Sequence, residues 1–491
     1  MWRWGCPSVA IVAACVALLA GAAPAAGSAY DCQGDNSATG FPAPRPTDRR
    51  LTFGVFPGGT AGAVVGPQRP GKPDDRAKII GAIDQLRGGR PFAVHLYLSF
   101  TGAADQAARE AEARGAIAFY AAHGLDVEYV LAYRPAARRG DADVADYVAW
   151  VRRMVDALGP LPGLRSLQVT NEVTNSTSPD ASDGAYPGAR DALIRGVVAA
   201  KAQARARGLD RLQIGFNWFY RLDPGTEQGF WEYVRDQGGP AFVRSLDWVG
   251  VDAYPGTYFP PGGLPRGDSL LNAISLLREC LMPIAAIPKT VPIHITENGW
   301  PTGAGRTVEE QAVALREMVQ AVHDQRANYN VTDYRWFDLR DGDSSDPDFQ
   351  QGYGLTYDDY RPKPAFGVYR TLLAALAEPP RAGARPGPDV LRAGRLAVTV
   401  RPRTALTGRL TRFTFTVTRP GARAGARRLA AAGVIVRFAH RRARTDRRGR
   451  AVLRLRFRRA GIRGVTATLP RFGAGRARVT VRQGSRAGRR T

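Results

Sequence analysis

The chain has 491 residues, of which 44% are hydrophobic, a length and composition ordinary for a globular protein of several domains. Residues 381–491 contain 31 Arg, no Lys and two acids, so this region has a net charge of +29, whereas the whole chain has a net charge of +25. The first 380 residues therefore hold the remaining 38 basic and 42 acidic side chains, a charge of −4. This distribution excludes a uniformly basic protein, because a nearly neutral body precedes a strongly basic C-terminal region.

The N-terminal residues predict a secretory signal peptide over 1–29. Arg3 precedes an apolar run from Val9 to Ala23, and small residues continue to Ala29. A membrane anchor is the alternative, but a run of about 15 residues is shorter than the roughly 20 that a spanning helix needs. No later segment is long and apolar enough to span a membrane, so we expect a secreted protein, extracellular or associated with the cell wall.

Two cysteines, Cys32 and Cys280, remain once the signal peptide is removed. Because the protein is expected to enter an oxidising compartment, a disulfide between them is one interpretation, and two free thiols are the other. The disulfide would tie an N-terminal arm, predicted over 30–50 from its Pro, Gly and Asp content, to the region that follows.

Between residues 51 and 377, strand-like and helix-like segments alternate. Helical spacing is clearest from Val144 to Leu158, and Thr307 with Glu310 predicts a capping box at the start of a later helix. A last helix is predicted over 364–377. Eight strand-like segments, rich in β-branched and aromatic residues, lie at 51–56, 92–100, 125–133, 164–172, 212–219, 246–254, 292–299 and 331–339.

Eight such units predict the α/β class and a (β/α)8 TIM barrel over 51–377. Parallel strands need crossover helices, and closing the sheet removes both of its edges. A doubly wound open sheet is the alternative. No Gly-rich phosphate-binding motif follows any strand, which disfavours that alternative.

The region after the barrel has a different character. Residues 378–394, rich in Pro, Ala, Gly and Arg, predict a linker. In 395–491, short strand-like segments place apolar Leu453 and Leu455 between arginines, as in a sheet with one buried and one solvated face. This pattern predicts a small all-β sandwich. The run TDRRGRAVLRLRF resembles those of bacterial immunoglobulin-like modules.

Polar residues end several of the predicted barrel strands, and in a parallel barrel these ends meet at one mouth. Two glutamates, from the fourth and seventh strands, are thereby expected to share a cavity with aromatic residues around it. Paired carboxylates beside an apolar face are what cleavage of a glycosidic bond requires. The strand-end residues are Thr170, Asn171, Glu172, Asp252, Tyr254, Glu297, Asn298, Trp336 and Asp338.

The motifs TNE at 170–172 and TENGWP at 296–301 resemble clan A of the glycoside hydrolases. The barrels of that clan carry an Asn-Glu acid/base after strand four and a Glu nucleophile after strand seven. Two later runs, YRWFDLRDGD and YGLTYDDYRPKPAF, are also similar to the last part of those barrels. The resemblance therefore covers roughly 51–377. It implies that Glu172 is the acid/base, that Glu297 is the nucleophile of a retaining reaction, and that Asn171 binds the sugar 2-hydroxyl.

The same resemblance implies further contacts. Tyr254 would orient Glu297, Trp336 would lie under the sugar ring, and Trp300 is either a sugar contact or a loop-packing residue. The sequence departs from the clan at strand two, because 91–104 lack the Arg that many members use to brace the nucleophile. His95 stands there with Tyr97, as a substrate contact or as a packed strand residue.

The implied function is a secreted retaining β-glycoside hydrolase that acts on poly- or oligosaccharides. The alternative is a non-catalytic carbohydrate-binding or wall-associated barrel. No cofactor is expected, since the five histidines are scattered without a zinc-binding spacing. An acidic segment after strand eight is either a calcium site or a solvated loop; it comprises Asp341, Asp343, Asp346 and Asp348.

The arginine-rich module over 395–491 has two interpretations. It is a possible anchor to an anionic wall polymer through charge, or a spacer whose composition is simply biased toward Arg. No helix-turn-helix or aromatic ribonucleoprotein motif is present, so specific nucleic-acid binding is not expected.

Overall fold

The computed structural model describes residues 40–59, 71–220, 224–258, 266–380, 396–419, 429–469 and 472–484. The predicted signal peptide, Cys32 and most of the predicted linker lie outside these ranges. Cys280 is disulfide-bonded, and because no other cysteine is described, its pairing with Cys32 stays a prediction. None of the described helices combines the length and the apolar character needed to cross a membrane.

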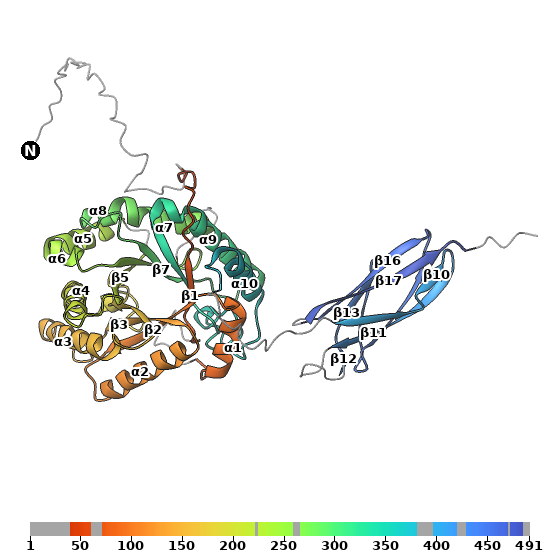
Figure 1. Ribbon diagram of the computed structural model, residues 1–491, viewed down its shortest axis with the longest axis horizontal. Helices are drawn as coiled ribbons and strands as arrows, with labels where there is room; N and C mark the ends of the chain where they lie inside the picture. Colours follow the sequence, from red (N-terminus) through yellow and green to blue (C-terminus); the bar gives the residue numbers. More distant parts are fainter. Residues whose placement is uncertain are drawn as a thin grey trace, which may run out of the picture.

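Eight parallel strands close into a barrel, in which each strand pairs with the next and β8 pairs with β1 (Figure 1). Each strand coincides with one of the strand-like segments of the sequence, so the barrel prediction is confirmed. The open sheet is excluded, because the pairing of β1 with β8 leaves no edge. The strands are β1 (Thr52–Val55), β2 (Ala93–Phe100), β3 (Asp126–Tyr133), β4 (Leu164–Val169), β5 (Gln213–Phe219), β6 (Trp248–Ala253), β7 (Ile293–Asn298) and β8 (Val331–Trp336).

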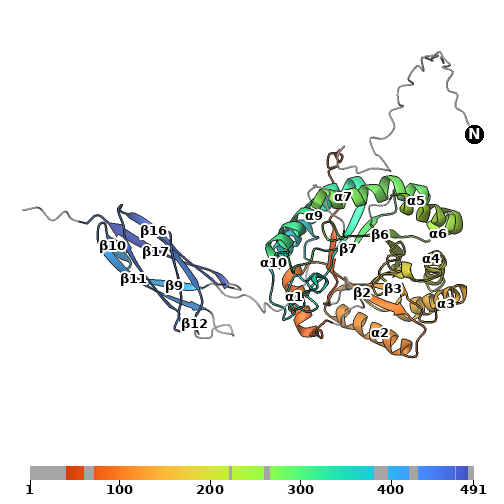
Figure 2. The same ribbon diagram turned by 180° about the vertical axis from the view of Figure 1, so that it is seen from behind.

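Helices surround the strands (Figure 2). The predicted capping box opens α9, where Thr307 Oγ1 accepts from the Glu310 N–H at 3.1 Å and Glu310 Oε2 accepts from the Thr307 N–H at 2.9 Å. The helices are α1 (Arg76–Arg87), α2 (Gln106–Ala122), α3 (Asp141–Leu158), α4 (Ala189–Ala206), α5 (Pro224–Tyr233), α6 (Gly239–Val243), α7 (Arg266–Leu276), α8 (Met282–Ile284), α9 (Val308–Tyr329) and α10 (Pro364–Leu376). Short 3-10 segments are η2 (Asp183–Ala185) and η5 (Phe349–Gln351), and π-helical turns are η3 (Val234–Gly238) and η4 (Leu277–Leu281).

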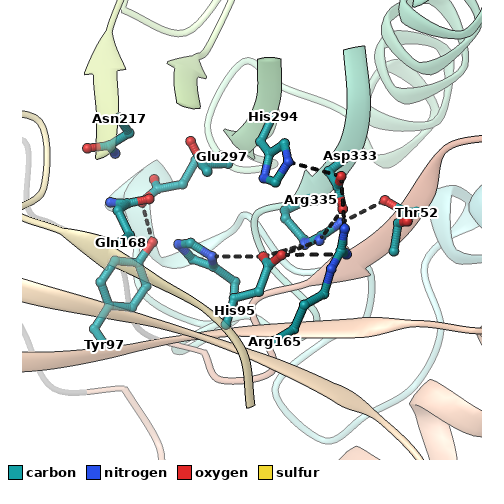
Figure 3. Close-up of polar contacts among 12 residues, drawn as sticks. Thr52, His95, Tyr97, Arg165, Gln168, Asn217, His294, Glu297, Asp333 and Arg335 are labelled. Atoms are coloured by element: carbon teal, nitrogen blue, oxygen red, sulfur yellow. Dashed lines mark hydrogen bonds and ion pairs between the residues drawn. The ribbon is translucent and has the colours of Figure 1, made fainter. Parts of the chain in front are cut away.

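A network of charged side chains fills part of the barrel interior (Figure 3). Arg335 on β8 donates to both carboxylate oxygens of Glu128 on β3, at 2.8 and 2.6 Å, and to Asp333 at 2.8 Å. Arg165 reaches Asp333 at 2.7 Å, and His294 Nε2 lies 3.1 Å from the same carboxylate. Burial lowers the pKa of His294 to about 4, so its imidazole is neutral at pH 7. The buried charges are therefore paired inside the barrel.

The absence of a side chain at Gly54 leaves room for the Arg335 side chain of this network. A Cβ atom at Gly54 on β1 would lie 2.5 Å from Arg335 Cδ and 2.5 Å from the Ala93 carbonyl oxygen, closer than atoms can approach. Only glycine at this position therefore lets the Arg335 side chain cross the barrel to Glu128.

Replacing Arg335 with Met is expected to lower the free energy of unfolding by about 3–5 kcal/mol at pH 7, because the buried Glu128 carboxylate loses its two hydrogen bonds from Arg335, while Arg165 still pairs with Asp333. Urea unfolding followed by tryptophan fluorescence measures this, since all described tryptophans lie in the barrel. The matched control is Arg361→Met, whose partner Asp359 is also on the surface; its effect should stay below about 1 kcal/mol.

The difference in free energy of unfolding between wild type and the Arg335→Met variant should be smaller at acidic pH. Burial opposes ionisation of Glu128, but the Arg335 guanidinium outweighs burial and holds the pKa of Glu128 well below its usual range. Burial likewise opposes ionisation of Asp333, and His294, Arg165 and Arg335 together lower its pKa. Groups with lowered pKa values stabilise the fold above their unfolded pKa of about 4 and lose that contribution as the pH falls. Equal stability of variant and wild type at pH 7 would contradict the pairing.

The described residues between 396 and 484 form two facing sheets. One has the strand order β10-β17-β16-β13-β14, and the other has β12-β11-β15 with β9 paired to β11. Phe413 and Phe415 of one sheet meet Phe438 of the other, with ring centroids 5.1 and 5.5 Å apart, in an apolar core. The strands are β9 (Ala397–Arg401), β10 (Thr404–Leu406), β11 (Leu410–Arg419), β12 (Leu429–Ala430), β13 (Ile435–Phe438), β14 (Arg441–Arg444), β15 (Arg450–Arg456), β16 (Gly461–Leu469) and β17 (Phe472–Arg482).

The all-β sandwich is thus confirmed, whereas the immunoglobulin-like assignment stays a prediction. The sequence pattern does not predict β10, β12 or β14. These strands are two to four residues long, too short for an alternating pattern to show.

Candidate active site

Three carboxyl groups meet at the carboxyl ends of the barrel strands. Glu172 follows β4, Asp252 lies near the end of β6, and Glu297 lies near the end of β7. One carboxylate oxygen from each residue lies within 4.8 Å of those from the other two, and the three residues are only 5%, 0% and 7% exposed. The two glutamates that the sequence singled out are therefore brought together, with Asp252 beside them.

The turn after β4 has an uncommon backbone conformation. Thr170 and Glu172 have φ values of 63° and 47°, in the left-handed region that residues other than glycine seldom adopt. The Glu172 N–H donates to Asn217 Oδ1 at 2.9 Å, and the Asn171 N–H donates to Asp183 Oδ2 at 2.7 Å. These buried hydrogen bonds hold a strained turn in place, which fixes the direction of the Glu172 side chain.

Glu172 lies in an environment that favours its protonated form. Burial, and then the negative charge of Glu297, raise the pKa of Glu172 to about 8. Ser182 Oγ donates a hydrogen bond to its Oε2, and Asn175 Nδ2 lies 3.5 Å from the same oxygen, which offsets the shift only in part. Glu172 therefore carries a proton at neutral pH, as a general acid must.

Glu297 is held by two phenols. Tyr254 O–H donates to one carboxylate oxygen. Tyr97 O–H donates to the other (Figure 3). Burial, and then the charge of Glu297, raise the pKa of both phenols well above the usual range, so both remain donors. Tyr97 comes from β2, the strand on which the clan's Arg is lacking. Two neutral donors thus hold Glu297 on both of its oxygens.

Asp252 accepts hydrogen bonds from residues on the two neighbouring strands, β5 and β7. Its Oδ1 accepts from Thr296 Oγ1 at 2.5 Å, and its Oδ2 accepts from Asn217 Nδ2. Asn217 Nδ2 also donates to Asn171 Oδ1 at 3.0 Å. Burial, and then the charge of Glu297, raise the pKa of Asp252 well above its usual range. Asp252 thus adds a buried polar link between β5, β6 and β7 beside Glu297.

Asn171 and Tyr254, both expected at the site, lie beside the glutamates. Asn171 Nδ2 donates one N–H to the Ala181 carbonyl at 3.0 Å, and its Oδ1 also accepts from Gln168 at 3.1 Å. The amide is thereby fixed in one orientation. Tyr254 touches Glu297 directly, as described above.

The structure corrects the expected position of the aromatic platform. Trp336 is 0% exposed and belongs to the barrel core, so neither of its faces is open to a sugar. The next residue, Phe337, is half-buried. It stacks on Phe56 at 5.2 Å and meets the Tyr254 ring at 6.3 Å. The aromatic residue that borders the site after β8 is therefore Phe337.

Two other expected contacts are packed away from the glutamates. His95 is buried one inward position before Tyr97, with Nδ1 3.5 Å from Glu128, so it belongs to the charged network (Figure 3). Trp300 is buried, with the guanidinium groups of Arg266 and Arg306 at 5.1 and 4.9 Å from its ring. Both residues are thus better explained as packing residues than as sugar contacts.

The acidic segment after β8 forms internal contacts. Asp341 is buried and accepts from Lys363 Nζ at 2.6 Å and Ser344 Oγ at 2.8 Å. Asp343 lies 3.0 Å from Lys72 Nζ. The interpretation as a wholly solvated loop is therefore wrong for Asp341. Among the described residues, these four aspartates do not converge on a common point that could hold a cation.

Two participants were not predicted from the sequence, and a third was predicted without a role. Ser182 lies on the long loop between β4 and α4, where no periodic pattern operates. Asn217 sits within a strand of apolar residues, and Asp252 was noted as a strand end without a role. The signal available for Asn217 and Asp252 was their polarity in strands whose other residues are nearly all buried.

The protein is a (β/α)8 barrel in which two glutamates lie together at the ends of strands four and seven. Glu172 has a raised pKa, and the hydroxyl groups of two tyrosines hold Glu297. No protein-family model matches the chain. In 144 residues it is 30% identical to the probable glucan endo-1,3-beta-glucosidase of Aspergillus clavatus. In 136 residues it is 28% identical to the protein of that name from Aspergillus fumigatus. These segments are 29% and 27% of this chain and 30% and 26% of the relatives, so the chain spans less than a third of the relatives' length.

Solved structures with similar folds include a GH5_18 from Bifidobacterium longum subsp. infantis and a beta-glucosidase from Exiguobacterium marinum. The first has a TM-score of 0.48 at 16% identity and covers 68% of this chain and 80% of its own. The second has a TM-score of 0.47 at 12% identity and covers 67% of this chain and 99% of its own. The two Aspergillus relatives are named as probable glucan endo-1,3-beta-glucosidases, which are glycoside hydrolases, the class that the two glutamate motifs resemble.

Proposed function

We propose that this protein is a secreted retaining β-glycoside hydrolase with Glu172 as the acid/base and Glu297 as the nucleophile. The observation that carries the proposal is the pair of carboxyl groups with oxygens within 4.8 Å of each other. Retaining glycosidases place their two carboxyl groups about 5–5.5 Å apart, whereas inverting ones leave about 6.5–9.5 Å for a water molecule. The separation supports a direct attack on the sugar. The predicted signal peptide supports secretion.

In the first step, Glu297 attacks C1 of the sugar while Glu172 gives its proton to the leaving glycosidic oxygen. The C1–O bond breaks, and a covalent glycosyl-enzyme forms on Glu297. In the second step, the ionised Glu172 takes a proton from water, which attacks C1 and releases Glu297. Two inversions return the β configuration, and Glu172 regains its proton.

The neighbouring groups assist these steps through charge and position. Tyr97 and Tyr254 hold the Glu297 carboxylate aligned through hydrogen bonds to both of its oxygens, and the second N–H of Asn171 Nδ2 is placed to donate to the sugar 2-hydroxyl. Hydrogen bonds to that hydroxyl strengthen in the transition state. Phe337, rather than Trp336, offers the apolar face for the ring.

A substrate panel tests the function. The names of the relatives make β-1,3-glucan the first polysaccharide to try, beside other β-glucans and aryl β-glycosides. We expect hydrolysis, with the β anomer as the first product seen by proton NMR. The alternative is a carbohydrate-binding barrel without catalysis. Binding of a glycan without turnover of any substrate would favour that alternative, and a first-formed α anomer would contradict the retaining mechanism.

Replacing Phe337 with Ala is expected to raise KM roughly tenfold, since loss of an aromatic face removes about 1–1.5 kcal/mol of contact with the sugar ring. Steady-state kinetics on the best substrate measure the change. The control is Phe119→Ala, which removes a half-buried aromatic ring near the end of α2. Unchanged KM in the Phe337 variant would contradict its assignment as the platform.

A further inference from the structure

Arg134, which directly follows β3 at the mouth of the barrel, fastens one short segment of the loop between β4 and α4. Its Nη1 donates to the Asp180 carbonyl at 2.7 Å, and its Nη2 donates to the Ala181 carbonyl at 2.6 Å. Its Nε donates to Asp183 Oδ1 at 3.3 Å. We call residues 180–184 the brace segment. A single guanidinium group thus holds three residues of this segment.

The brace segment is joined to the turn that carries Glu172. Asp183 is 0% exposed, and its Oδ2 accepts from the Asn171 N–H at 2.7 Å and from the Tyr133 N–H at 2.6 Å. The Asp183 N–H donates in turn to the Asn171 carbonyl at 2.8 Å. Both backbone groups of the residue before Glu172 are therefore paired with one residue of the brace segment.

Close packing of backbone on backbone fixes the brace segment further. A Cβ atom at Gly184 would lie 2.5 Å from the carbonyl oxygens of Val173 and Asn175, closer than such atoms can approach. Glycine therefore lets the segment lie directly against the chain that follows Glu172. Because the two backbones are in contact, a displacement of the segment would be transmitted to the residues beside Glu172.

Ser182 links the brace segment to the carboxyl group itself. Its Oγ donates to Glu172 Oε2 and accepts from Asn175 Nδ2 at 2.9 Å. The Ser182 side chain is buried, so its direction depends on the backbone of the segment. The contacts therefore run from Arg134 through the brace segment to the carboxyl group of Glu172.

Arg134 also acts on Glu172 through its charge. Burial, and then the charge of Glu297, raise the pKa of Glu172 to about 8. Hydrogen bonds from Ser182 and Asn175, and then the Arg134 guanidinium, act to lower this pKa. Among the described groups with the largest influence on it, Arg134 is the one positive charge. The titratable side chains that face Glu172 from β2, β6, β7 and the loop after β6 are all acids: Tyr97, Asp252, Glu297 and Tyr258.

We propose that Arg134 is a positioning residue for Glu172, because its guanidinium fork holds the brace segment from which Ser182 reaches the carboxyl group. The proposal rests on the proposed function, in which Glu172 is the acid/base. A guanidinium group presents several donors in a rigid planar fork, whereas an ammonium group is a point charge on a flexible chain. Three acceptors along one segment therefore suit Arg. Strand two lacks the Arg with which many clan members brace the nucleophile, whereas here an Arg after strand three braces the acid/base.

The first test depends on the leaving group. Departure of a sugar needs a proton from the acid/base, whereas a dinitrophenolate departs without one. Arg134→Gln should lower kcat/KM about 10- to 100-fold on the best glycan of the substrate panel, since small displacements of a catalytic group are that costly. On a dinitrophenyl β-glycoside the change in kcat/KM should stay below about threefold. Steady-state kinetics on the full chain measure both.

Arg87→Gln is the matched control. Arg87 ends α1 and contacts the chain just before β3, at the end of the barrel away from the mouth. Like Arg134, it pairs with one aspartate, Asp84 at 2.8 Å, and donates to two carbonyl groups, those of His123 and Gly124 at 2.8 and 3.0 Å. Its side chain is 12% exposed, against 20% for Arg134. Loss of these contacts should change kcat/KM less than about twofold on either substrate, because they do not lead to Glu172.

The second test needs no turnover. Carbon NMR of the chain labelled at its Glu carboxyl groups follows the titration of Glu172, whose signal is identified by its loss in Glu172→Gln. We expect the pKa of Glu172 to be higher in Arg134→Gln than in wild type and to be unchanged in Arg87→Gln. Arg134→Lys keeps the charge without the fork, so it should raise this pKa less than Arg134→Gln does and still lose activity on the glycan. The Lys variant also carries the test if Arg134→Gln does not fold.

Several outcomes would overturn the proposal. Equal losses on the two substrates, or equal losses in Arg134→Gln and Arg87→Gln, would show general destabilisation rather than positioning. An unchanged pKa of Glu172 in Arg134→Gln, or full activity of Arg134→Lys on the glycan, would exclude a role for the fork. If the wild-type chain turned over no substrate, the proposed function would fail, and the titration would then decide by itself whether Arg134 controls Glu172.

Discussion

The Glu297→Ala variant is expected to lose hydrolysis by a factor on the order of 10⁴ or more, because no other group can form the covalent bond to C1. Azide enters the space left by the missing carboxylate and attacks C1 of an activated aryl β-glycoside directly. A single displacement inverts the sugar, so the rescued product is the α-glycosyl azide. Rates of aryl release with and without azide, and the configuration of the product by NMR, measure the two effects.

A matched control removes a carboxylate outside the site. Glu317→Ala, on the solvent side of α9, should leave the rate within about twofold because surface substitutions have small effects. Full activity of the Glu297 variant would end the hydrolase proposal as stated. A β-glycosyl azide from the same variant would show instead that Glu297 is the acid/base and that the two roles are exchanged.

The Glu172→Gln variant is expected to lose about 10²–10⁴-fold in kcat/KM on unactivated glycans, since the leaving oxygen then departs without a proton. The pH profile gives a sharper readout. The active form carries a proton on Glu172, whose pKa is raised to about 8 by burial and by the charge of Glu297. Wild-type kcat/KM should therefore fall as the pH rises through about 8. The variant should show no fall in that range, and azide should give it a β-glycosyl azide.

Ser182→Ala serves as the control for this pH profile. Its hydroxyl bonds to Glu172 and lowers the pKa of that carboxyl, so the variant should keep activity and move the basic limb to higher pH. A basic limb that persists unchanged in Glu172→Gln would contradict the assignment. The group responsible would then be sought at Asp252, the other carboxyl at the site whose pKa is raised well above its usual range.

The aromatic platform shows why sequence reasoning placed Trp336 at the site although its side chain lies in the barrel core. Successive side chains of a strand point to opposite faces. An error of one position therefore replaces a residue that faces the barrel mouth with one whose side chain packs in the core. Trp336 and Phe337 are both aromatic and adjacent, and composition offers no means of choosing between them. Tyr97 presents the opposite case: its position was noted, but only the closed barrel brings its phenol to Glu297, 200 residues away.

The sequence by itself determined the eight strands, their alternation with helices, the two glutamates and the arginine-rich sandwich. These depend on local periodicity and on strand ends, which can be read within a few residues. The tertiary structure alone decided which side chains meet: Ser182 with Glu172, Tyr97 with Glu297, Asn217 with Asp252, and Arg335 with Glu128. It also decided that the pKa of Glu172 is raised to about 8. Burial and neighbouring charge set a pKa, and both arise from contacts between residues far apart in the chain.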